Sequence, residues 1–311
     1  MTKTKKSRAL VRFALAGKTE KAIGIVLDGL TSEHSKRAYE RHLTAFFAWH
    51  CASGQGQVNK ALVQRYAAEL RELGVSPSTV NQKLSAIRKL ALEAADNGAL
   101  DSQIANGIKA VKGIRQEGIR SGNWLTKQQA QKLLDAADTD TLKGLRDRAI
   151  LAVLLGCGLR RAEAANLAFD HLQQRDGRWV LVDLVGKRNK VRSVPMPNWA
   201  KAAIDSYASA ANLAEHSVFR PINRGGRMTG ERMTDQAIYN IVAEYAKFLA
   251  LGEIAPHDLR RTFAKLAHKG GSAIDQIQLS LGHGSIQTTE RYLGVEQDLT
   301  DAPCDHLGLR L

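Results

Sequence analysis

The stretch RDRAILAVLLGCGLRRAEAANLAF, residues 146–169, decides the fold of the C-terminal half of the chain. Its first part is apolar enough to predict a buried helix that Gly156 and Gly158 stop, and its second part predicts another helix. The following stretch, RWVLVDLVGKRNKVRSVPMP, alternates, is rich in valine and has GKRN at its centre, which is typical of a β-hairpin. Helical patterns fill the chain from Trp199 onward. We therefore expect a mainly α fold with a small antiparallel β-sheet.

The N-terminal part of the chain predicts a small bundle of helices. A first helix is expected to begin at Thr31 or Ser32 and to end at a glycine-rich turn over residues 54–56. VNKALVQRYAAELRELG predicts a second helix, and SPSTVNQKLSAIRKLALEAADNG predicts a third, with Pro77 in its first turn. We expect this bundle to extend to about Leu100.

Length and composition favour two domains joined by a linker. A chain of 311 residues exceeds the usual size of a single domain. The segment NGIKAVKGIRQEGIRSGNW carries repeated glycines, which disfavour a stable helix. After it, Thr126 and Gln129 fit a helix N-cap with its capping-box partner. The expected divisions are a basic leader (1–22), a helical domain (23–105), a basic glycine-rich linker (106–123), a second domain (124–298) and a tail (299–311).

The charge balance indicates a polyanionic partner. The chain has 45 Lys and Arg against 31 Asp and Glu, a formal net charge of +14, and its pI is near 9.8. Nucleic acid is the commonest polyanion that such an excess binds, while a surface that is merely soluble is the alternative. The cations expected to face DNA phosphates lie on the bundle and along the linker: Lys36, Arg37, Arg41, Lys83, Arg88, Lys89, Lys109, Lys112 and Arg115.

The remaining composition argues against membrane, secreted and metal-binding classes. No apolar run approaches the roughly 18 residues that a membrane span needs, and the basic N-terminus lacks the apolar core of a signal peptide. Cys51, Cys157 and Cys304 are far apart and odd in number, which gives neither a disulfide framework nor zinc-ligand spacing. We expect a soluble cytoplasmic protein without a bound metal.

Six polar residues at the ends of predicted elements suit phosphoryl transfer, although each alone also fits an ordinary surface or core position. Two guanidiniums can hold the non-bridging oxygens of a phosphodiester. A lysine on a hairpin can protonate a leaving alkoxide, and histidines can hydrogen-bond the phosphate or help deprotonate the nucleophile. A tyrosine can then attack phosphorus where neighbouring cations favour its phenolate. The six residues are Arg160, Lys187, His257, Arg260, His283 and Tyr292.

The motifs around these residues resemble those of the tyrosine recombinases, the phage-integrase family. GLR at 158–160, with Glu163 three residues on, is similar to the family's first arginine motif. GKRNK at 186–190 resembles its hairpin-lysine motif, with Arg188 where glycine is common. HDLR at 257–260 resembles H-x-x-R, and LGH at 281–283 followed by Tyr292 resembles the last motif. The likeness covers roughly residues 124–293, and the preceding bundle is similar, more weakly, to the family's SAM-like core-binding domain.

The resemblance implies a site-specific recombinase whose second domain is catalytic. Tyr292 would attack a DNA phosphodiester, leaving a 3′-phosphotyrosyl bond and a free 5′-hydroxyl, and a partner strand would reverse the step without ATP, metal or other cofactor. The family acts as a homo-tetramer on double-stranded DNA with inverted-repeat core sites, through a four-way junction. Accessory DNA-bending proteins are further expected partners, residues 299–311 are a candidate subunit-exchange segment, and the expected setting is a bacterial or phage-like nucleoid.

Alternatives stay open for both the function and the site. A type IB topoisomerase would use similar residues to reseal a single duplex, and a DNA-binding regulator could keep the same scaffold without cutting. Neighbouring cations also compete for three of the catalytic positions. Motif spacing favours the first residue of each pair: Arg160 over Arg161, Arg260 over Arg261 and Lys187 over Lys190.

Overall fold

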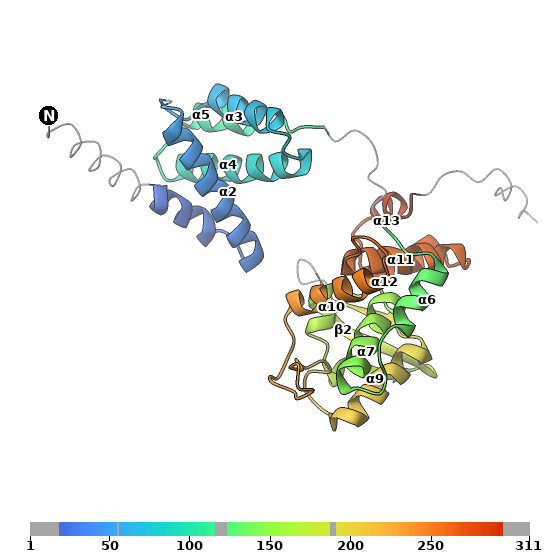
Figure 1. Ribbon diagram of the computed structural model, residues 1–311. Helices are drawn as coiled ribbons and strands as arrows, with labels where there is room; N and C mark the ends of the chain where they lie inside the picture. Colours follow the sequence, from blue (N-terminus) through green and yellow to red (C-terminus); the bar gives the residue numbers. More distant parts are fainter. Residues whose placement is uncertain (1–18, 55, 116–122, 187–190, 295–311) are drawn as a thin grey trace, which may run out of the picture. The chain divides into compact units, whose positions relative to one another are not determined.

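The structure of the chain is a computed structural model that describes residues 19–54, 56–115, 123–186 and 191–294. Its contacts divide the chain into two compact units, Met1–Gly118 and Ile119–Leu311 (Figure 1). Helices dominate both units, and one small sheet lies in the second. The expectation of a mainly α fold with a small antiparallel sheet is therefore confirmed.

The N-terminal unit is a helical bundle around one apolar core. Residues 19–28 are helical, so the expected basic leader overlaps a helix over residues 19–22. The helices that follow are α2 (Glu33–Ala52), α3 (Lys60–Glu72), α4 (Pro77–Asp96) and α5 (Ser102–Lys109). Ser32 precedes α2 and Pro77 opens α4, as the sequence predicts. Phe46 and Tyr66 meet edge to face in the core, with ring centroids 5.2 Å apart.

Helix α5 departs from the sequence-based expectation. The interpretation of the glycine-rich segment as non-helical is wrong for residues 106–109, which lie in α5. The Asp101 carboxylate accepts hydrogen bonds from two backbone amides at the start of α5, and Ile108 is fully buried. Beyond the helix, the Asn81 side chain donates to the carbonyl of Ile114 at 2.9 Å and accepts from its amide at 2.8 Å. Capping and burial outweigh the low helix propensity of Gly107.

The C-terminal unit begins with a capped helix and continues into a buried one. Thr126 and Gln129 form the predicted capping box at the start of its first helix. The predicted helix after Gly158 is shorter than expected and ends at Ala165, where the Asn166 side chain donates to the Ala162 carbonyl at 2.8 Å. The elements before the sheet are α6 (Lys127–Asp135), α7 (Leu142–Gly156), α8 (Arg161–Ala165) and the 3-10 helix η1 (Phe169–His171).

The sheet has three antiparallel strands in the order β1-β2-β3. The predicted hairpin corresponds to β2 (Arg178–Val185) and β3 (Val191–Pro195), with Leu181 opposite Val194. Its tip, residues 187–190, lies outside the described residues. Strand β1 (Leu172–Arg175) pairs with β2 through a tight turn at Asp176 and Gly177 and was not predicted individually.

After the sheet, the helices in the described part of the C-terminal unit are α9 (Asn198–Ala211), α10 (Asp235–Phe248), α11 (Pro256–Lys269), α12 (Ile274–Leu281) and α13 (Ile286–Leu293). Helix α7 packs against α9 and α11, and its middle is fully buried. Helices α11, α12 and α13 contact one another at one end of the unit, coloured orange to red in Figure 1. Among the described residues, no helix is long and apolar enough to cross a membrane.

Candidate active site

Five of the six residues predicted to be catalytic lie at the junction of α8, α11, α12 and α13. Arg160 occupies the N-cap of α8, and His257 and Arg260 lie in the first turns of α11. His283 follows the end of α12, and Tyr292 is near the end of α13. Lys187 and its competitor Lys190 lie outside the described residues. The structure therefore brings together five side chains that the sequence separates by up to 132 positions, since 292 − 160 = 132.

Arg160 and Arg260 converge on one backbone oxygen. Arg160 Nη2 donates to the Leu281 carbonyl at 3.2 Å, and Arg260 Nη2 donates to the same oxygen. Arg260 Nη1 also donates to the Gly158 carbonyl at 2.6 Å, and its side chain is only 2% exposed. Burial and the neighbouring Arg160 lower the pKa of Arg260 to about 9. Arg260 therefore stays positive at neutral pH, and the convergence of the two guanidiniums makes a site for an anion.

Glu163 holds Arg160 in place together with a residue that the sequence analysis missed, Arg192 on β3. Glu163 Oε2 accepts from the Arg160 amide at 2.8 Å, and Oε1 accepts from Arg160 Nη1 at 2.7 Å. Arg192 binds both oxygens of the same carboxylate, at 2.6 and 2.8 Å. Burial alone would raise the pKa of Glu163, but the hydrogen bonds from Arg192 and Arg160 lower it to about 2. In the sequence, the signal available for Arg192 was a single cation within the short predicted strand VRSVP.

Tyr292 lies between the two histidines, with its hydroxyl engaged by the main chain. Its hydroxyl donates to the His257 carbonyl at 3.2 Å. The rings of His257 and His283 meet the tyrosine ring edge-on, with centroids 5.4 and 5.3 Å away. Burial raises the pKa of Tyr292, although Arg260 and Arg261 act in the opposite direction. The expectation that cations favour the phenolate is therefore correct in sign, but burial outweighs it in the free protein.

Both histidines are held in the neutral form. Burial, reinforced by nearby arginines, lowers the pKa of His257 and lowers that of His283 to about 4. His283 Nδ1 lies 3.0 Å from the hydroxyl of Thr289, whose side chain is fully buried. Neutral imidazoles can accept a proton or donate a single hydrogen bond, so these two suit proton transfer and phosphate binding more than charge neutralisation.

The neighbouring arginines occupy other environments. Arg161 is 43% exposed and pairs with Asp235 at 3.3 Å. Arg261 pairs with Asp258 at 3.4 Å, and its Cζ lies 4.9 Å from the centroid of the Tyr292 ring. Neither guanidinium reaches the Leu281 carbonyl in any hydrogen bond of the described residues. The geometry thus favours Arg160 and Arg260 as the anion-binding pair and places Arg261 against the nucleophile candidate.

The cations predicted to face DNA differ in whether contacts within the protein already engage their side chains. Lys36 pairs with Glu33 at 3.0 Å, Lys89 pairs with Glu93 at 2.8 Å, and Arg88 donates to the Val111 carbonyl. Lys83 is half-buried beside the Tyr66 hydroxyl at 3.4 Å, and burial and Arg41 lower its pKa. The exposed members of the set are Arg37, Arg41, Lys109, Lys112 and Arg115. Internal contacts hold Arg88 and Lys89, which makes them weaker candidates for phosphate binding.

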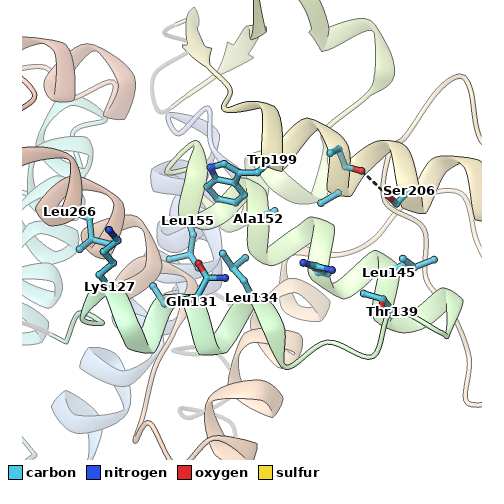
Figure 2. Close-up of a pocket in the computed structure, with 14 residues that line it drawn as sticks. Lys127, Gln131, Leu134, Thr139, Leu145, Ala152, Leu155, Trp199, Ser206 and Leu266 are labelled. Carbon is cyan, nitrogen blue, oxygen red and sulfur yellow. Dashed lines mark hydrogen bonds between the residues drawn. The ribbon is translucent and has the colours of Figure 1, made fainter. Parts of the chain in front are cut away.

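No group of three or more His, Cys, Asp or Glu in the described part of the chain could hold a metal ion. A cavity of about 740 Å³ lies between α6, α7, α9 and α11 and is lined mainly by apolar side chains, including Leu134, Leu155 and Trp199 (Figure 2). Its lining residues include none of the arginines, histidines or tyrosine described above. The cavity is therefore separate from the cluster of side chains at the α8–α11–α12–α13 junction.

Comparison with known proteins finds relatives along almost the whole chain. Residues 123–298 match the phage integrase family, and residues 25–98 match the phage integrase N-terminal SAM-like domain. The chain is 31% identical over 276 residues to tyrosine recombinase XerC of Thermodesulfovibrio yellowstonii, covering 85% of this chain and 87% of the relative.

Two solved structures share the fold at lower identity. The XerH site-specific recombinase, in a post-cleavage complex with palindromic difH substrate, is 20% identical with a TM-score of 0.67, covering 83% of this chain and 76% of that chain. A lambda integrase dimer bound to a COC′ core site is 15% identical with a TM-score of 0.67, covering 91% of this chain and 79% of that chain.

Proposed function

The chain belongs to the phage integrase family and is a site-specific tyrosine recombinase, and we propose that it acts through a covalent bond between Tyr292 and DNA. The observation that carries the proposal is the convergence of Arg160 and Arg260 on the carbonyl of Leu281, a residue of the apolar cluster against which Tyr292 packs. A scissile phosphate bound by this pair would place its phosphorus next to the phenol. The two guanidiniums would then stabilise the phosphate with fixed positive charge in place of water.

The proposed cleavage step exchanges one phosphate ester for another. The Tyr292 oxygen bonds to phosphorus as the bond from phosphorus to the 5′ oxygen breaks, which leaves a 3′-phosphotyrosyl linkage. The phenol proton leaves to His257 or to solvent, and the departing 5′ oxygen takes a proton from Lys187. Arg160 and Arg260 stabilise the charge that gathers on the non-bridging oxygens, the role that planar guanidiniums fill best.

Rejoining is the same step in reverse with a different strand. The 5′-hydroxyl of a partner strand attacks the phosphotyrosyl linkage and returns Tyr292 to its starting form. Because the ester bond is conserved throughout, the reaction needs no nucleotide hydrolysis. The Tyr292 hydroxyl donates to the His257 carbonyl, so it must give up this contact before its proton can leave and its oxygen can attack phosphorus.

The proposed substrate is double-stranded DNA with an inverted-repeat core site, bound by a homo-tetramer with accessory DNA-bending proteins, in the cytoplasm and associated with the nucleoid. The excess of 45 Lys and Arg over 31 Asp and Glu supports DNA as the substrate. The exposed Arg37 and Arg41 on α2 and Lys112 and Arg115 after α5 are the phosphate contacts that we propose for the N-terminal unit. The tail, residues 299–311, lies outside the described residues, and its exchange between subunits stays a prediction.

The direct test is to trap the covalent intermediate. Nicked duplexes that tile the DNA flanking the protein's own coding sequence would be incubated with wild-type protein, Tyr292→Phe and the control Tyr239→Phe. Tyr239 is 38% exposed on α10, so its hydroxyl should be dispensable. We expect an adduct at an inverted repeat with the wild type and the control, and none with Tyr292→Phe.

Two further outcomes would redirect the proposal. Site-specific binding by the wild-type protein without any adduct would favour a regulator that does not cut. An adduct that reseals only within its own duplex, with no exchange between two sites, would favour a topoisomerase-like activity.

A further inference from the structure

We propose that Arg192 is a positioning residue for DNA cleavage, which holds Glu163 and thereby keeps the Arg160 guanidinium available to the scissile phosphate. The inference rests on the proposed function and adds a residue to its machinery. Arg192 lies on β3, two residues after the tip of the hairpin, and its side chain is 9% exposed.

Arg192 joins three separate elements through every nitrogen of its guanidinium. Nη1 and Nη2 each donate to one oxygen of Glu163 on α8, at 2.6 and 2.8 Å, and Nε donates to the Ser280 carbonyl on α12 at 2.9 Å. Arg160 instead keeps its side chain 33% exposed. Since Arg160 is much more exposed than Arg192 and its Nε has no hydrogen bond to Glu163, we assign the contact with a DNA phosphate to Arg160 and not to Arg192.

The charge of Arg192 determines how strongly Glu163 competes for Arg160. Glu163 carries one negative charge and accepts hydrogen bonds from both Arg160 and Arg192. With Arg192 present, the three side chains sum to one positive charge, so the cluster can still attract a phosphate. Without Arg192, the carboxylate would pair with Arg160 alone, and the charge of these two side chains would sum to zero. A buried carboxylate with one partner would also draw Arg160 toward itself and away from the phosphate position.

The backbone beside the site is shaped to admit Arg192. Gly282 follows α12 with φ +62°, and a Cβ at this position would lie 2.8 Å from Cδ of Arg192. Gly282 separates Leu281, whose carbonyl binds Arg160 and Arg260, from His283. The missing side chain therefore lets Arg192 reach the carbonyl of Ser280 and support the segment that carries two parts of the site. This contact is independent of the ion pair with Glu163 and indicates the same role.

The experiment measures binding and cleavage separately. Single-turnover adduct formation would be followed on a nicked synthetic duplex that carries the inverted repeat mapped for the wild-type protein, and binding to the intact duplex would be measured alongside. Arg192→Gln should lower the cleavage rate by about 10–100-fold, the loss seen when a hydrogen-bond partner of a metal ligand is removed from an enzyme, with the dissociation constant for DNA little changed. The cleavage rate of Arg192→Lys should lie between those of the wild type and Arg192→Gln, since lysine keeps the charge but not the paired hydrogen bonds. Arg178→Gln, an exposed arginine at the start of β2, is the matched control.

A double-mutant cycle tests whether Arg192 acts through Arg160. In an Arg160→Ala background, adding Arg192→Gln should lower cleavage by less than about threefold, because residues that act as a unit are not additive. A substrate with sulfur in place of the bridging 5′ oxygen needs no proton on its leaving group. The Arg192→Gln loss should persist with this substrate, since the variant affects the arginines and not the proton donor.

Three results would overturn the inference. Full additivity with Arg160→Ala would mean that Arg192 acts independently of that residue. Recovery of Arg192→Gln on the sulfur substrate would assign Arg192 to leaving-group protonation. A parallel loss of binding and thermal stability in both Arg192→Lys and Arg192→Gln would make the role purely structural. Failure of the wild-type protein to form any adduct would instead contradict the proposed function itself.

Discussion

Replacing Gly158 with alanine should damage both the fold and the active site, because it strains the backbone and crowds the packing at the same position. Gly158 has φ +59°, and its carbonyl accepts the 2.6 Å hydrogen bond from Arg260 Nη1. An alanine Cβ would lie 2.6 Å from Cδ1 of Phe263 and 3.1 Å from two further atoms of that ring.

The magnitude follows from two costs. A side chain in the left-handed region costs about 1–2 kcal/mol, and an overpacked contact of this kind costs about 1–3 kcal/mol. The expected loss in the free energy of unfolding is therefore roughly 2–5 kcal/mol. Because relief of the contact would shift the Gly158 carbonyl, Arg260 should also move, and cleavage should fall even where the protein remains folded.

Gly177→Ala is the control that separates the two costs. Gly177 has φ +72° in the turn between β1 and β2, and nothing lies within 4 Å of a Cβ built there. Its replacement should cost only the conformational part, about 1–2 kcal/mol, and leave cleavage intact. Urea unfolding followed by tryptophan fluorescence would measure both variants, since Trp124, Trp179 and Trp199 report on this unit. Equal stability losses in the two variants would refute the argument from Phe263.

Three further predictions concern charge and titration. Arg260→Ala should keep site binding but lose about 10²–10³-fold in cleavage rate. Arg261→Ala removes a contact with the tyrosine ring and an ion pair with Asp258, but no anion-binding group, so its cleavage rate should fall much less; equal losses in the adduct assay would contradict this assignment. Folding lowers the pKa of His283 from 6.5 to about 4, so the unfolded chain binds a proton more readily than the folded one between these values. The contribution of His283 to the free energy of unfolding is therefore complete above about pH 6.5 and is lost as the pH falls toward 4. An NMR titration of His283 with a midpoint near 6.5 would contradict this prediction. Arg41→Ala should reduce the slope of log affinity against log salt by about 0.9, while Arg88→Ala should leave the slope unchanged, because that guanidinium binds the Val111 carbonyl.

Local signals in the sequence predicted much of the fold. Thr126 and Gln129 specify a capping box within four residues, and Pro77 marks the first turn of α4, so each could be recognised without knowledge of tertiary contacts. The alternating stretch around the hairpin likewise predicts β2 and β3. Helix α5 could not be recognised in this way, because its stability depends on burial of Ile108 against the rest of the bundle.

The residues of the active site likewise divide into those with a local signal in the sequence and those that depend on tertiary contacts. Motif spacing selected Arg160 and Arg260 over their neighbours, and the structure brings these two together. Arg192 escaped notice because its importance comes from Glu163 and Ser280, which are 29 and 88 residues away in the chain. The state of Tyr292 could not be derived either, since burial and nearby arginines shift its pKa in opposite directions and only the folded arrangement decides the outcome.

The two acceptors that hold Arg260 are main-chain oxygens, those of Gly158 and Leu281. No side-chain replacement deletes a carbonyl, so an alanine scan would leave both acceptors in place and assign them no importance. Their positions are set by the left-handed glycines at 158 and 282. In a mutational survey, the anchoring of this arginine would therefore register as intolerance at two glycines that carry no functional group.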